Sequence, residues 1–478
     1  MSDLMKSPSS SGLGHRPFKA KTRVRVPLGM PCPVIAALSL FLLFWIGVPF
    51  ASHSALEVDV TQGSFRPYVM EVALDGGGGL GAAVKRIVLD DLCSSGVFKR
   101  SSLTLDVRPA AIQEALAGNR TDWSAWQAES KADFVLLLAV TVTGRAMVVR
   151  GKLFDLMRRK EVYSFTRTVQ ASENRHLAHK IADRCYKAAT GQPGYFSTKI
   201  TYVGGVGTGG HRSFCLGSID SDGFGAKRHR CFNTLLKMPK VDHKGRLFYI
   251  RNQKRGKNQL FMWDAHAKRE KVLKTPSEVF SVSPFGNTNL MLLSLRHRKR
   301  DKATGARLSY IGLLDWDQGT LRRLTIPANA IYVSPAGHNE NPNIVFNANR
   351  QKVPWLYQVP TRGGNVTRFL GDSMHRFYSP TFSTNGKRLA FIRKSPDGYQ
   401  VCTSSPSGEH LRVLTTLFWA ETPAWSPLGT SAIVFSGRHS RRAPAQLYRL
   451  DLNSLKIYRL STNDEAIEPL WTTSAVFP

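Results

Sequence analysis

The sequence feature that most limits the fold of this chain is a motif of proline and glycine that recurs through its C-terminal half. The fullest copy is Thr422–Gly429 (TPAWSPLG). Shorter copies are Val241–Gly245 (VDHKG), Val282–Gly286 (VSPFG), Val333–Gly337 (VSPAG) and Phe382–Gly386 (FSTNG). Their closing glycines follow one another at intervals of 41, 51, 49 and 43 residues, a period typical of propeller blades. Because Pro fixes φ and Gly tolerates positive φ, each copy is predicted to form a tight turn.

Three short apolar runs follow the motif, which is the number that a four-stranded blade needs in addition to the strand before the turn. After Gly429 these runs are Ala432–Phe435, Gln446–Asp451 and Ile457–Leu460. A first repeat, residues 198–236, lacks its opening strand, and the segment Pro469–Ser474 has no strands after it. That segment is predicted to supply the missing strand and close the ring, which removes exposed sheet edges. We therefore predict an all-β six-bladed β-propeller over residues 196–478.

Residues 56–195 are predicted to form a small α/β domain. Apolar patterns indicate strands at Tyr68–Leu74, Asp133–Thr143, Ala146–Phe154 and Val162–Val169. The glycines at 76–79 are interpreted as a flexible loop before a helix that runs from Ala83 toward Gly96. A second helix is predicted to be capped by Ser172 and to end in the segment 190–194.

Three polar residues of the second predicted helix lie one turn apart, namely His176, His179 and Asp183. Such a spacing suits a metal ion. Hydrogen-bonded side chains of structural importance are much commoner at such positions, and this is the interpretation that we favour. We therefore expect no metal and no cofactor.

Residues 1–55 have the pattern of an export signal. Lys6 and five further Lys or Arg residues up to Arg25 precede the uncharged run Val34–Phe50, and small residues at Ser54 and Ala55 permit cleavage. The run is about 17 residues long, at the short limit for a membrane span. We expect export to the periplasm, with retention as an uncleaved inner-membrane anchor as the alternative.

The chain is strongly basic, with 66 Lys and Arg against 34 Asp and Glu and a formal net charge of +32. This charge suggests an anionic partner, although solvated surface charge is an equally good interpretation. Export argues against nucleic acid, while peripheral association with a membrane stays open. The six cysteines show no metal-binding spacing. Cys215 and Cys231 could bridge within one blade, but we slightly favour two separate buried thiols.

Catalytic motifs are absent from the sequence: it contains no G-x-S-x-G, no H-E-x-x-H and no P-loop. The strands expected around the propeller channel offer mostly apolar and hydroxyl side chains, which are poor ligands for a catalytic metal. We therefore expect no enzyme. A propeller enzyme (a hydrolase or lactonase) and a module that binds anionic lipid or polysaccharide in the envelope are the alternatives.

The links from the outer strand of one blade to the inner strand of the next are expected to surround the channel at one face. They span 275–280, 326–332, 370–379, 416–422 and 462–468, and they contain the acids Glu278, Asp372, Glu421, Asp464, Glu465 and Glu468 beside the aromatic residues Phe377, Tyr378, Phe418 and Trp419. Basic runs at 251–257, 296–302 and 438–442 fall in loops farther from the axis. We hypothesise an acidic, aromatic mouth inside a basic collar, which could steer a partner and then hold it.

The order of several segments resembles that of the TolB family. Asn174–Asp183 (NRHLAHKIAD) and Gly194–Val203 (GYFSTKITYV) resemble the junction between the two domains of TolB, and Leu56–Gly63 (LEVDVTQG) resembles its mature N-terminus. TolB proteins are periplasmic propellers of the Gram-negative Tol–Pal cell-envelope system. With the repeats, the resemblance covers nearly all of the chain after residue 55. No copy of the motif reads Ser-Pro-Asp-Gly in full, a departure that bears on partner specificity.

The resemblance implies a non-catalytic scaffold that supports envelope integrity and outer-membrane constriction at division. It implies that the mouth binds the peptidoglycan-associated lipoprotein Pal, through Glu278, His375, Trp419, Glu421 and Glu465. It also implies that the N-terminal strand binds a TolA-like inner-membrane protein, through Leu56, Glu57, Val58, Asp59 and Val60.

Overall fold

The computed structural model describes residues 66–102, 108–119, 123–207, 212–253, 257–264, 267–300, 305, 307–325, 330–350, 353–460, 462, 465–474 and 476. The predicted signal, the strand Leu56–Val60 and Asp464 lie outside these residues. The chain from Ser54 to Pro478 belongs to one compact unit. Of the helices in the described part, none is long and apolar enough to cross a membrane.

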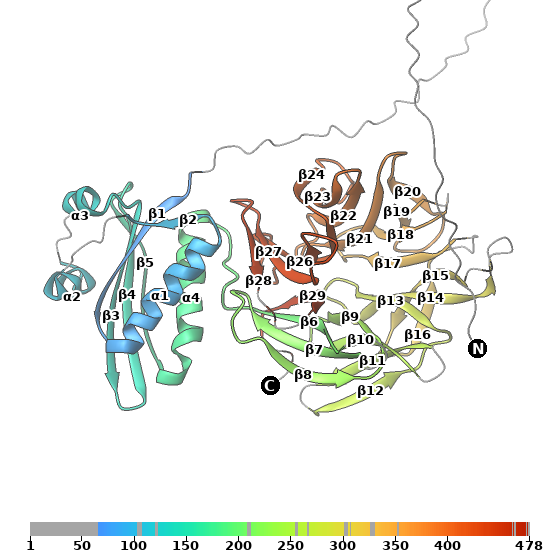
Figure 1. Ribbon diagram of the computed structural model, residues 1–478, viewed down its shortest axis with the longest axis horizontal. Helices are drawn as coiled ribbons and strands as arrows, with labels where there is room; N and C mark the ends of the chain where they lie inside the picture. The colour runs from blue at the N-terminus through green and yellow to red at the C-terminus, as the bar shows by residue number, and fades with distance from the viewer. Residues whose placement is uncertain are drawn as a thin grey trace, which may run out of the picture. The chain divides into compact units, whose positions relative to one another are not determined.

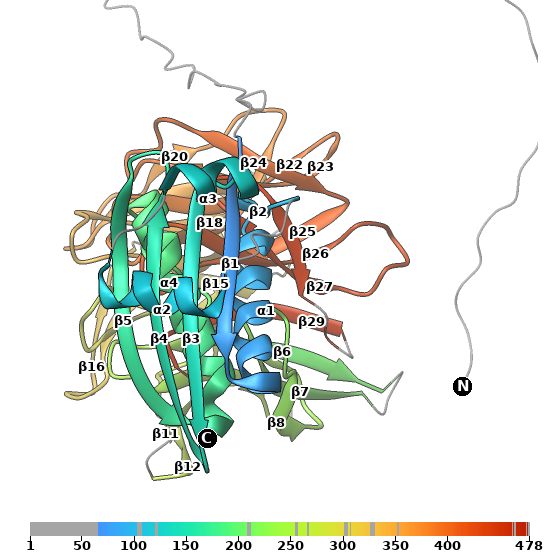
Figure 2. The same ribbon diagram turned by 90° about the vertical axis from the view of Figure 1, so that its left-hand side faces the viewer.

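The first described part is a five-stranded sheet with helices on both faces (Figures 1 and 2). The strand order is β2-β1-β3-β4-β5, with β1 parallel to both β2 and β3. The strands are β1 (Tyr68–Gly76), β2 (Phe98–Arg100), β3 (Phe134–Thr143), β4 (Ala146–Asp155) and β5 (Lys160–Gln170). The helices are α1 (Gly78–Ser94), α2 (Pro109–Ala117), α3 (Trp123–Ser130) and α4 (Asn174–Thr190).

The two faces of this sheet are covered by different helices because successive side chains of a strand point in opposite directions. Leu136 and Leu138 of β3 pack in one cluster with the apolar residues of α1 and α4. Val135 and Leu137 pack on the other side with Ile112 of α2 and Trp126 of α3. Strand β3 is therefore buried on both faces, as its continuous apolar run predicts.

Two local predictions for this domain are wrong. Helix α1 begins at Gly78 and not at Ala83, because Gly77 adopts φ 75 and turns the chain directly from β1 into the helix. A Cβ at Gly77 would lie 2.5 Å from the side chain of Val140, so the turn requires glycine. Ser172 does not cap the second helix: it lies in a 3-10 turn, and Gln170 and Glu173 form a capping box before α4.

The rest of the described chain forms six four-stranded sheets around a channel, so the predicted α/β domain and six-bladed β-propeller are confirmed (Figure 1). The first three blades in sequence order consist of β29 (Glu465–Thr472), β6 (Lys199–Val206), β7 (Ser213–Asp220) and β8 (Lys227–Phe232); of β9 (Leu236–Val241), β10 (Leu247–Asn252), β11 (Asn258–Asp264) and β12 (Arg269–Leu273); and of β13 (Val279–Pro284), β14 (Leu290–Arg300), β15 (Arg307–Asp315) and β16 (Thr320–Arg323).

The other three blades consist of β17 (Tyr332–Ala336), β18 (Asn343–Ala348), β19 (Trp355–Pro360) and β20 (Thr367–Leu370); of β21 (Arg376–Phe382), β22 (Leu389–Ser395), β23 (Gly398–Ser404) and β24 (Arg412–Leu417); and of β25 (Trp419–Trp425), β26 (Ala432–Arg438), β27 (Gln446–Asp451) and β28 (Ile457–Leu460). Strands β9, β13, β17, β21, β25 and β29 contact one another and are the inner strands. In the first blade, β29 from the end of the chain pairs antiparallel with β6, which places Trp471 opposite Ile200.

The recurring motif combines a bulge within the inner strand and a turn after it, and the sequence alone does not distinguish the two. In five inner strands a residue with positive φ precedes a proline: Met238, Ser334, Ser379, Thr422 and Glu468, with φ between 49 and 54. The pairing register shifts at each of these positions. Ser334 and Pro335 therefore belong to the bulge of β17, and the prediction of a turn at Val333–Gly337 is wrong. The turn of this blade follows at His338–Asn341, where the Asn341 amide donates to the His338 carbonyl at 2.9 Å.

Cys215 and Cys231 form a disulfide bond, so the expectation of two separate thiols is wrong. The two residues face each other directly in the register of β7 and β8, with their Cα atoms 4.0 Å apart. Facing positions of this kind are close enough for a bridge. The sequence gives their separation but not the register that brings them together.

Loss of this disulfide is expected to lower the free energy of unfolding by about 3 kcal/mol, because it closes a loop of 16 residues in the unfolded chain. Denaturant unfolding with and without reductant measures the effect, and a Cys215→Ala/Cys231→Ala variant serves as the control because reductant should leave it unchanged. Equal unfolding free energies of the wild type in both conditions would contradict the prediction.

Candidate functional site

A pocket of about 50 Å³ lies between the inner strands, and its wall consists largely of the proline bulges. This volume holds only a few water molecules. Among the described residues that line it, Lys240 and Glu468 are the charged ones, and most of the others are prolines and hydroxyl residues. Besides Glu468, the described lining residues offer no carboxylate, His or Cys side chain for a metal ion.

Glu468 stands at the bulge of β29, with its side chain partly enclosed by the channel wall. Its carboxylate accepts a hydrogen bond from the backbone N–H of Met238 on the neighbouring inner strand. Burial raises the pKa of Glu468 to about 7, and the charge of Glu421 adds to this shift, while the lysines Lys237 and Lys240 oppose it. Burial also lowers the pKa values of both lysines. The mouth of the channel thus contains an acid that titrates near neutral pH.

The elevated pKa of Glu468 predicts a pH-dependent stability. Because the folded pKa of about 7 exceeds the ordinary value of 4.5, the folded state binds more protons between these limits, and the contribution of Glu468 is lost as the pH rises through them. Between pH 5 and pH 8 this loss amounts to at most about 2.5 kcal/mol, reduced by water in the channel. Denaturant unfolding at both pH values should show a smaller difference for Glu468→Gln than for the wild type. Equal differences in both proteins would contradict the assignment.

Glu278 lies directly before β13 and its carboxylate is almost fully buried. It accepts a hydrogen bond from the backbone N–H of Asn258 at 3.3 Å and forms an ion pair with Arg296 at 3.6 Å. Burial lowers the pKa of Lys237, and the charges of Glu468 and Glu278 both oppose this shift, so the two acids lie near the same lysine. A pocket of about 590 Å³ opens beside Glu278, and Lys257, Lys274, Arg296 and Arg298 are among its lining residues. An acid at the mouth thus contacts the collar directly.

Trp419, Arg438 and Glu465 form a second group at the mouth. The Arg438 guanidinium lies 5.3 Å from the centre of the Trp419 ring and donates a hydrogen bond of 2.6 Å to Glu465. The other carboxylate oxygen of Glu465 pairs with Arg212. Two arginines thus neutralise Glu465, and one of them holds the indole ring in place.

Glu421 differs from these acids because it is exposed and forms no ion pair with any residue that the structure describes. Its pKa is raised by desolvation, since the walls of the mouth displace much of the surrounding water. The pKa of Tyr378 on the neighbouring inner strand is raised mainly by burial, and the charge of Glu421 adds to this shift. Glu421 is therefore an acid whose charge a partner could use.

The predicted binding residues lie at the ends of strands and not in long loops. Trp419 and Glu421 belong to the first half of β25, where they pair with Arg438 and Ser436, and Glu465 begins β29. His375 directly precedes β21, and its Nδ1 lies at hydrogen-bonding distance from the Asp372 carboxylate, at 2.9 Å. The structure thus groups Glu278 and Glu421 around Glu468, and Trp419 with Glu465.

Sequence reasoning did not select Lys237 and Lys240 of β9. Lys237 directly precedes the Met238-Pro239 pair, and Lys240 directly follows it. This pair corresponds to the Thr422-Pro423 pair of β25. If the five inner strands had been aligned on the residue that precedes their proline, Lys237 and Lys240 would have been placed at the mouth. The alignment on the closing glycines did not show this correspondence.

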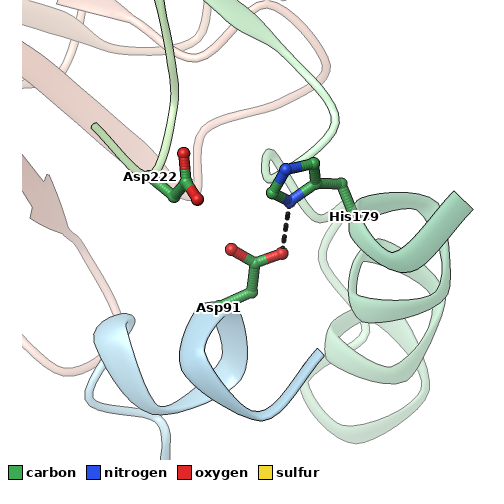
Figure 3. A group of neighbouring side chains, drawn as sticks. All are labelled: Asp91, His179 and Asp222. Atoms are coloured by element: carbon green, nitrogen blue, oxygen red, sulfur yellow. Dashed lines mark hydrogen bonds and ion pairs between the residues drawn. The ribbon is translucent and has the colours of Figure 1, made fainter. Parts of the chain in front are cut away.

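The three residues of α4 that were considered as metal ligands do not converge. Asp183 accepts hydrogen bonds from the backbone N–H groups of Phe196 and Ser197, at 2.6 and 3.2 Å, and so fixes the start of the propeller. His179 is buried, and its Nδ1 lies 2.6 Å from the Asp91 carboxylate of α1. Within the described ranges, the group of His and carboxylate side chains close enough to share an ion is Asp91, His179 and Asp222 (Figure 3).

Comparison with known proteins gives a consistent result. A family model described as the TolB β-propeller domain matches residues 186–475. The Tol-Pal system protein TolB of Thiobacillus denitrificans is 28% identical over 198 residues, which are 41% of this chain and 44% of that protein. The protein of the same name from Methylococcus capsulatus is 33% identical over 171 residues, which are 35% of this chain and 39% of that protein. The matches therefore span less than half the length of these relatives.

A solved structure agrees with the fold. TolB from Acinetobacter baumannii matches 85% of this chain and 96% of its own, with a TM-score of 0.70 and 22% sequence identity. This likeness covers both the α/β part and the propeller. Since the family model extends over more than half of the chain, the chain belongs to the TolB β-propeller family.

Proposed function

We propose that the protein is a non-catalytic periplasmic component of the Tol–Pal system and that the mouth of its propeller binds the peptidoglycan-associated lipoprotein. The names of its relatives support membership of that system. The observation that carries the binding site is the exposed carboxylate of Glu421, which has no ion-pair partner among the described residues and lies on the same strand as Trp419. The disulfide supports export, because such bonds persist in oxidising compartments such as the periplasm.

The mouth combines the elements that a protein interface needs at its centre. Phe418 is 51% exposed between β24 and β25 and offers an apolar anchor beside the indole ring of Trp419. Glu421 would pair with a basic or hydrogen-bond-donating group of the partner in a partly desolvated position, where such a pair is strong. Glu278 and Glu465 would position the arginines with which they form ion pairs, so that these arginines contact the partner. His375 would contact the partner at the rim of the mouth.

We further propose that the protein divides into an export signal or anchor (1–55), an α/β domain (56–195) and the propeller (196–478). The segment Leu56–Val60 would bind a TolA-like inner-membrane protein by adding a strand to it, as its alternating apolar and acidic residues suggest. The protein would then connect an inner-membrane protein with an outer-membrane lipoprotein and support envelope constriction at division.

A pull-down from envelope extract tests this proposal with four proteins: the wild type, Trp419→Ala/Glu421→Lys, a variant without residues 56–60, and Glu340→Lys. The last is a control, because Glu340 is an exposed acid in the turn after β17, at the opposite end of the blades. We expect only the mouth variant to lose the peptidoglycan-associated lipoprotein, and only the truncated variant to lose the inner-membrane partner. Retention of every partner by both variants would contradict the site assignment.

Attraction to anionic lipid or polysaccharide is a second candidate function, favoured by the net charge of +32. Such attraction depends mainly on counterions, so it should vanish as the ionic strength rises. Binding to the lipoprotein should persist at high salt because it includes apolar and desolvated contacts. A salt series with anionic vesicles and with the isolated lipoprotein domain separates these two functions.

A further inference from the structure

Asp91, His179 and Asp222 form a cluster between the α/β domain and the first propeller blade. Asp91 belongs to α1, His179 to α4, and Asp222 to the turn between β7 and β8. One possible ligand atom from each residue lies within 4.8 Å of those of the other two. The three side chains lie close together, and Nδ1 of His179 is directed at the Asp91 carboxylate (Figure 3).

Two atoms of this cluster are buried without a hydrogen-bond partner. They are Oδ1 of Asp91 and Nε2 of His179, on side chains that are only 1% and 4% exposed. Burying polar atoms in this way is costly unless something satisfies them. The other ring nitrogen of His179, Nδ1, lies 2.6 Å from Oδ2 of Asp91. The two ring nitrogens point in divergent directions, so an ion shared by Asp91 and His179 would take the place of the proton between Nδ1 and Oδ2.

We propose that Asp91, His179 and Asp222 bind a divalent transition-metal ion of the Zn²⁺ class. One imidazole and two carboxylates are ligands that Zn²⁺ accepts, with water in the remaining position. Ligands around such an ion are separated by at most about 4 Å, so the cluster must contract slightly. Asp222 can provide this movement because it lies in a turn and its side chain is 21% exposed. The ion would link two helices of the α/β domain to the first blade.

The proposed site has a route from solvent and a competing cation. A pocket of about 440 Å³ opens beside Asp222 and is lined by Arg86, Asp90, Cys93 and Arg175, among others. The Arg175 guanidinium pairs with Asp222 and also, at 3.3 Å, with Asp220. Asp222 additionally accepts the backbone N–H of Phe224 at 3.0 Å. Binding of the ion would displace Arg175 toward Asp220, and Arg175 therefore weakens the site without blocking it.

Calorimetric titration of the chelator-treated full chain with ZnCl₂ tests the proposal, with Co²⁺ absorption as a second readout. We expect one ion per chain and a higher melting temperature with Zn²⁺. Asp222→Asn, a change of nearly equal size in a half-buried turn residue, is expected to weaken binding about 10- to 100-fold. Arg175→Gln is expected to strengthen it. His176→Gln is the matched control, because His176 lies on the same helix outside the cluster and should leave the affinity unchanged.

The outcomes separate a metal site from a network of charges that needs no ion. Absence of stoichiometric Zn²⁺ binding in the wild type would overturn the proposal. Equal affinities of the wild type and Asp222→Asn would also overturn it, since the ion would then bind elsewhere. A Co²⁺ spectrum with thiolate charge-transfer bands would assign the ion to a free cysteine such as Cys93 and contradict the ligand set. The proposal does not depend on the partners of the mouth.

Discussion

Replacing Arg449 with alanine is expected to lower the free energy of unfolding by about 3 to 5 kcal/mol. Arg449 is a residue of β27 that is only 1% exposed. Its guanidinium donates hydrogen bonds to the carbonyl of Ser221 at 2.6 Å and to the hydroxyl of Ser94. Ser94 ends α1 of the α/β domain, and Ser221 follows β7 of the first blade. One side chain thus connects the last blade, the first blade and the α/β domain.

The aromatic surroundings of Arg449 add to the expected loss. The guanidinium carbon lies 5.2 Å from the ring centre of Tyr195 and 5.1 Å from that of Tyr458. Alanine would leave a cavity beside these rings and would remove the guanidinium donor from the Ser221 carbonyl, while the Ser94 hydroxyl would keep its hydrogen bond to the Asp91 carbonyl. Loss of this connection should also separate the unfolding of the α/β domain from that of the propeller.

Denaturant unfolding followed by far-UV circular dichroism and tryptophan fluorescence measures both effects. Arg459→Ala is the matched control, because Arg459 is exposed on β28 and should change the unfolding free energy by less than about 0.5 kcal/mol. A loss of that small size in Arg449→Ala would show that the buried guanidinium does not hold the domains together.

Reversing the charge of Glu421 is expected to weaken binding of the peptidoglycan-associated lipoprotein at least 10-fold. This prediction rests on the proposed function. A lysine at position 421 would remove the exposed carboxylate proposed to pair with the partner and would repel a basic group of the partner at that position. Trp419→Ala should weaken binding by about 1 to 3 kcal/mol through loss of the ring that Arg438 supports.

Isothermal titration with the soluble domain of the lipoprotein measures these changes, and Glu340→Lys again provides a control of equal charge. Because Trp419 and Glu421 lie on the same strand, the double variant should lose less than the sum of the single losses. Affinities of Glu421→Lys and Glu340→Lys that agree within error would contradict a role for the mouth.

The repeat predicts the architecture because a propeller blade reuses one local pattern. The apolar runs Gln446–Asp451 and Ile457–Leu460 match β27 and β28 to the residue, and Ala432–Phe435 predicts the start of β26, which extends to Arg438. The detailed meaning of the motif was harder to infer, because Thr422–Gly429 contains both a bulge (Thr422-Pro423) and a turn (Ser426–Gly429). Val333–Gly337 matches the turn by its letters but occupies the bulge by its register. Only strand pairing distinguishes the two.

The site was less predictable than the fold, because its interactions join residues that are far apart in sequence. Acids could be assigned to the mouth from their position before inner strands, but the pairing of Glu465 with Arg212 could not. The same limit applies to the cluster between the domains, where Asp91 and His179 are 88 residues apart. Helical spacing grouped His179 with His176 and Asp183, whereas the structure groups it with Asp91 and Asp222.

Photo-crosslinking in intact cells tests the central claim most directly, with the crosslinker at Phe418 in the mouth or at Glu340 at the opposite end of the blades. Phe418 is 51% exposed and does not belong to a strand, so the substitution should leave the fold unchanged. We predict that the peptidoglycan-associated lipoprotein is crosslinked from position 418 and not from position 340. Crosslinking of the lipoprotein from position 340 alone would contradict the account.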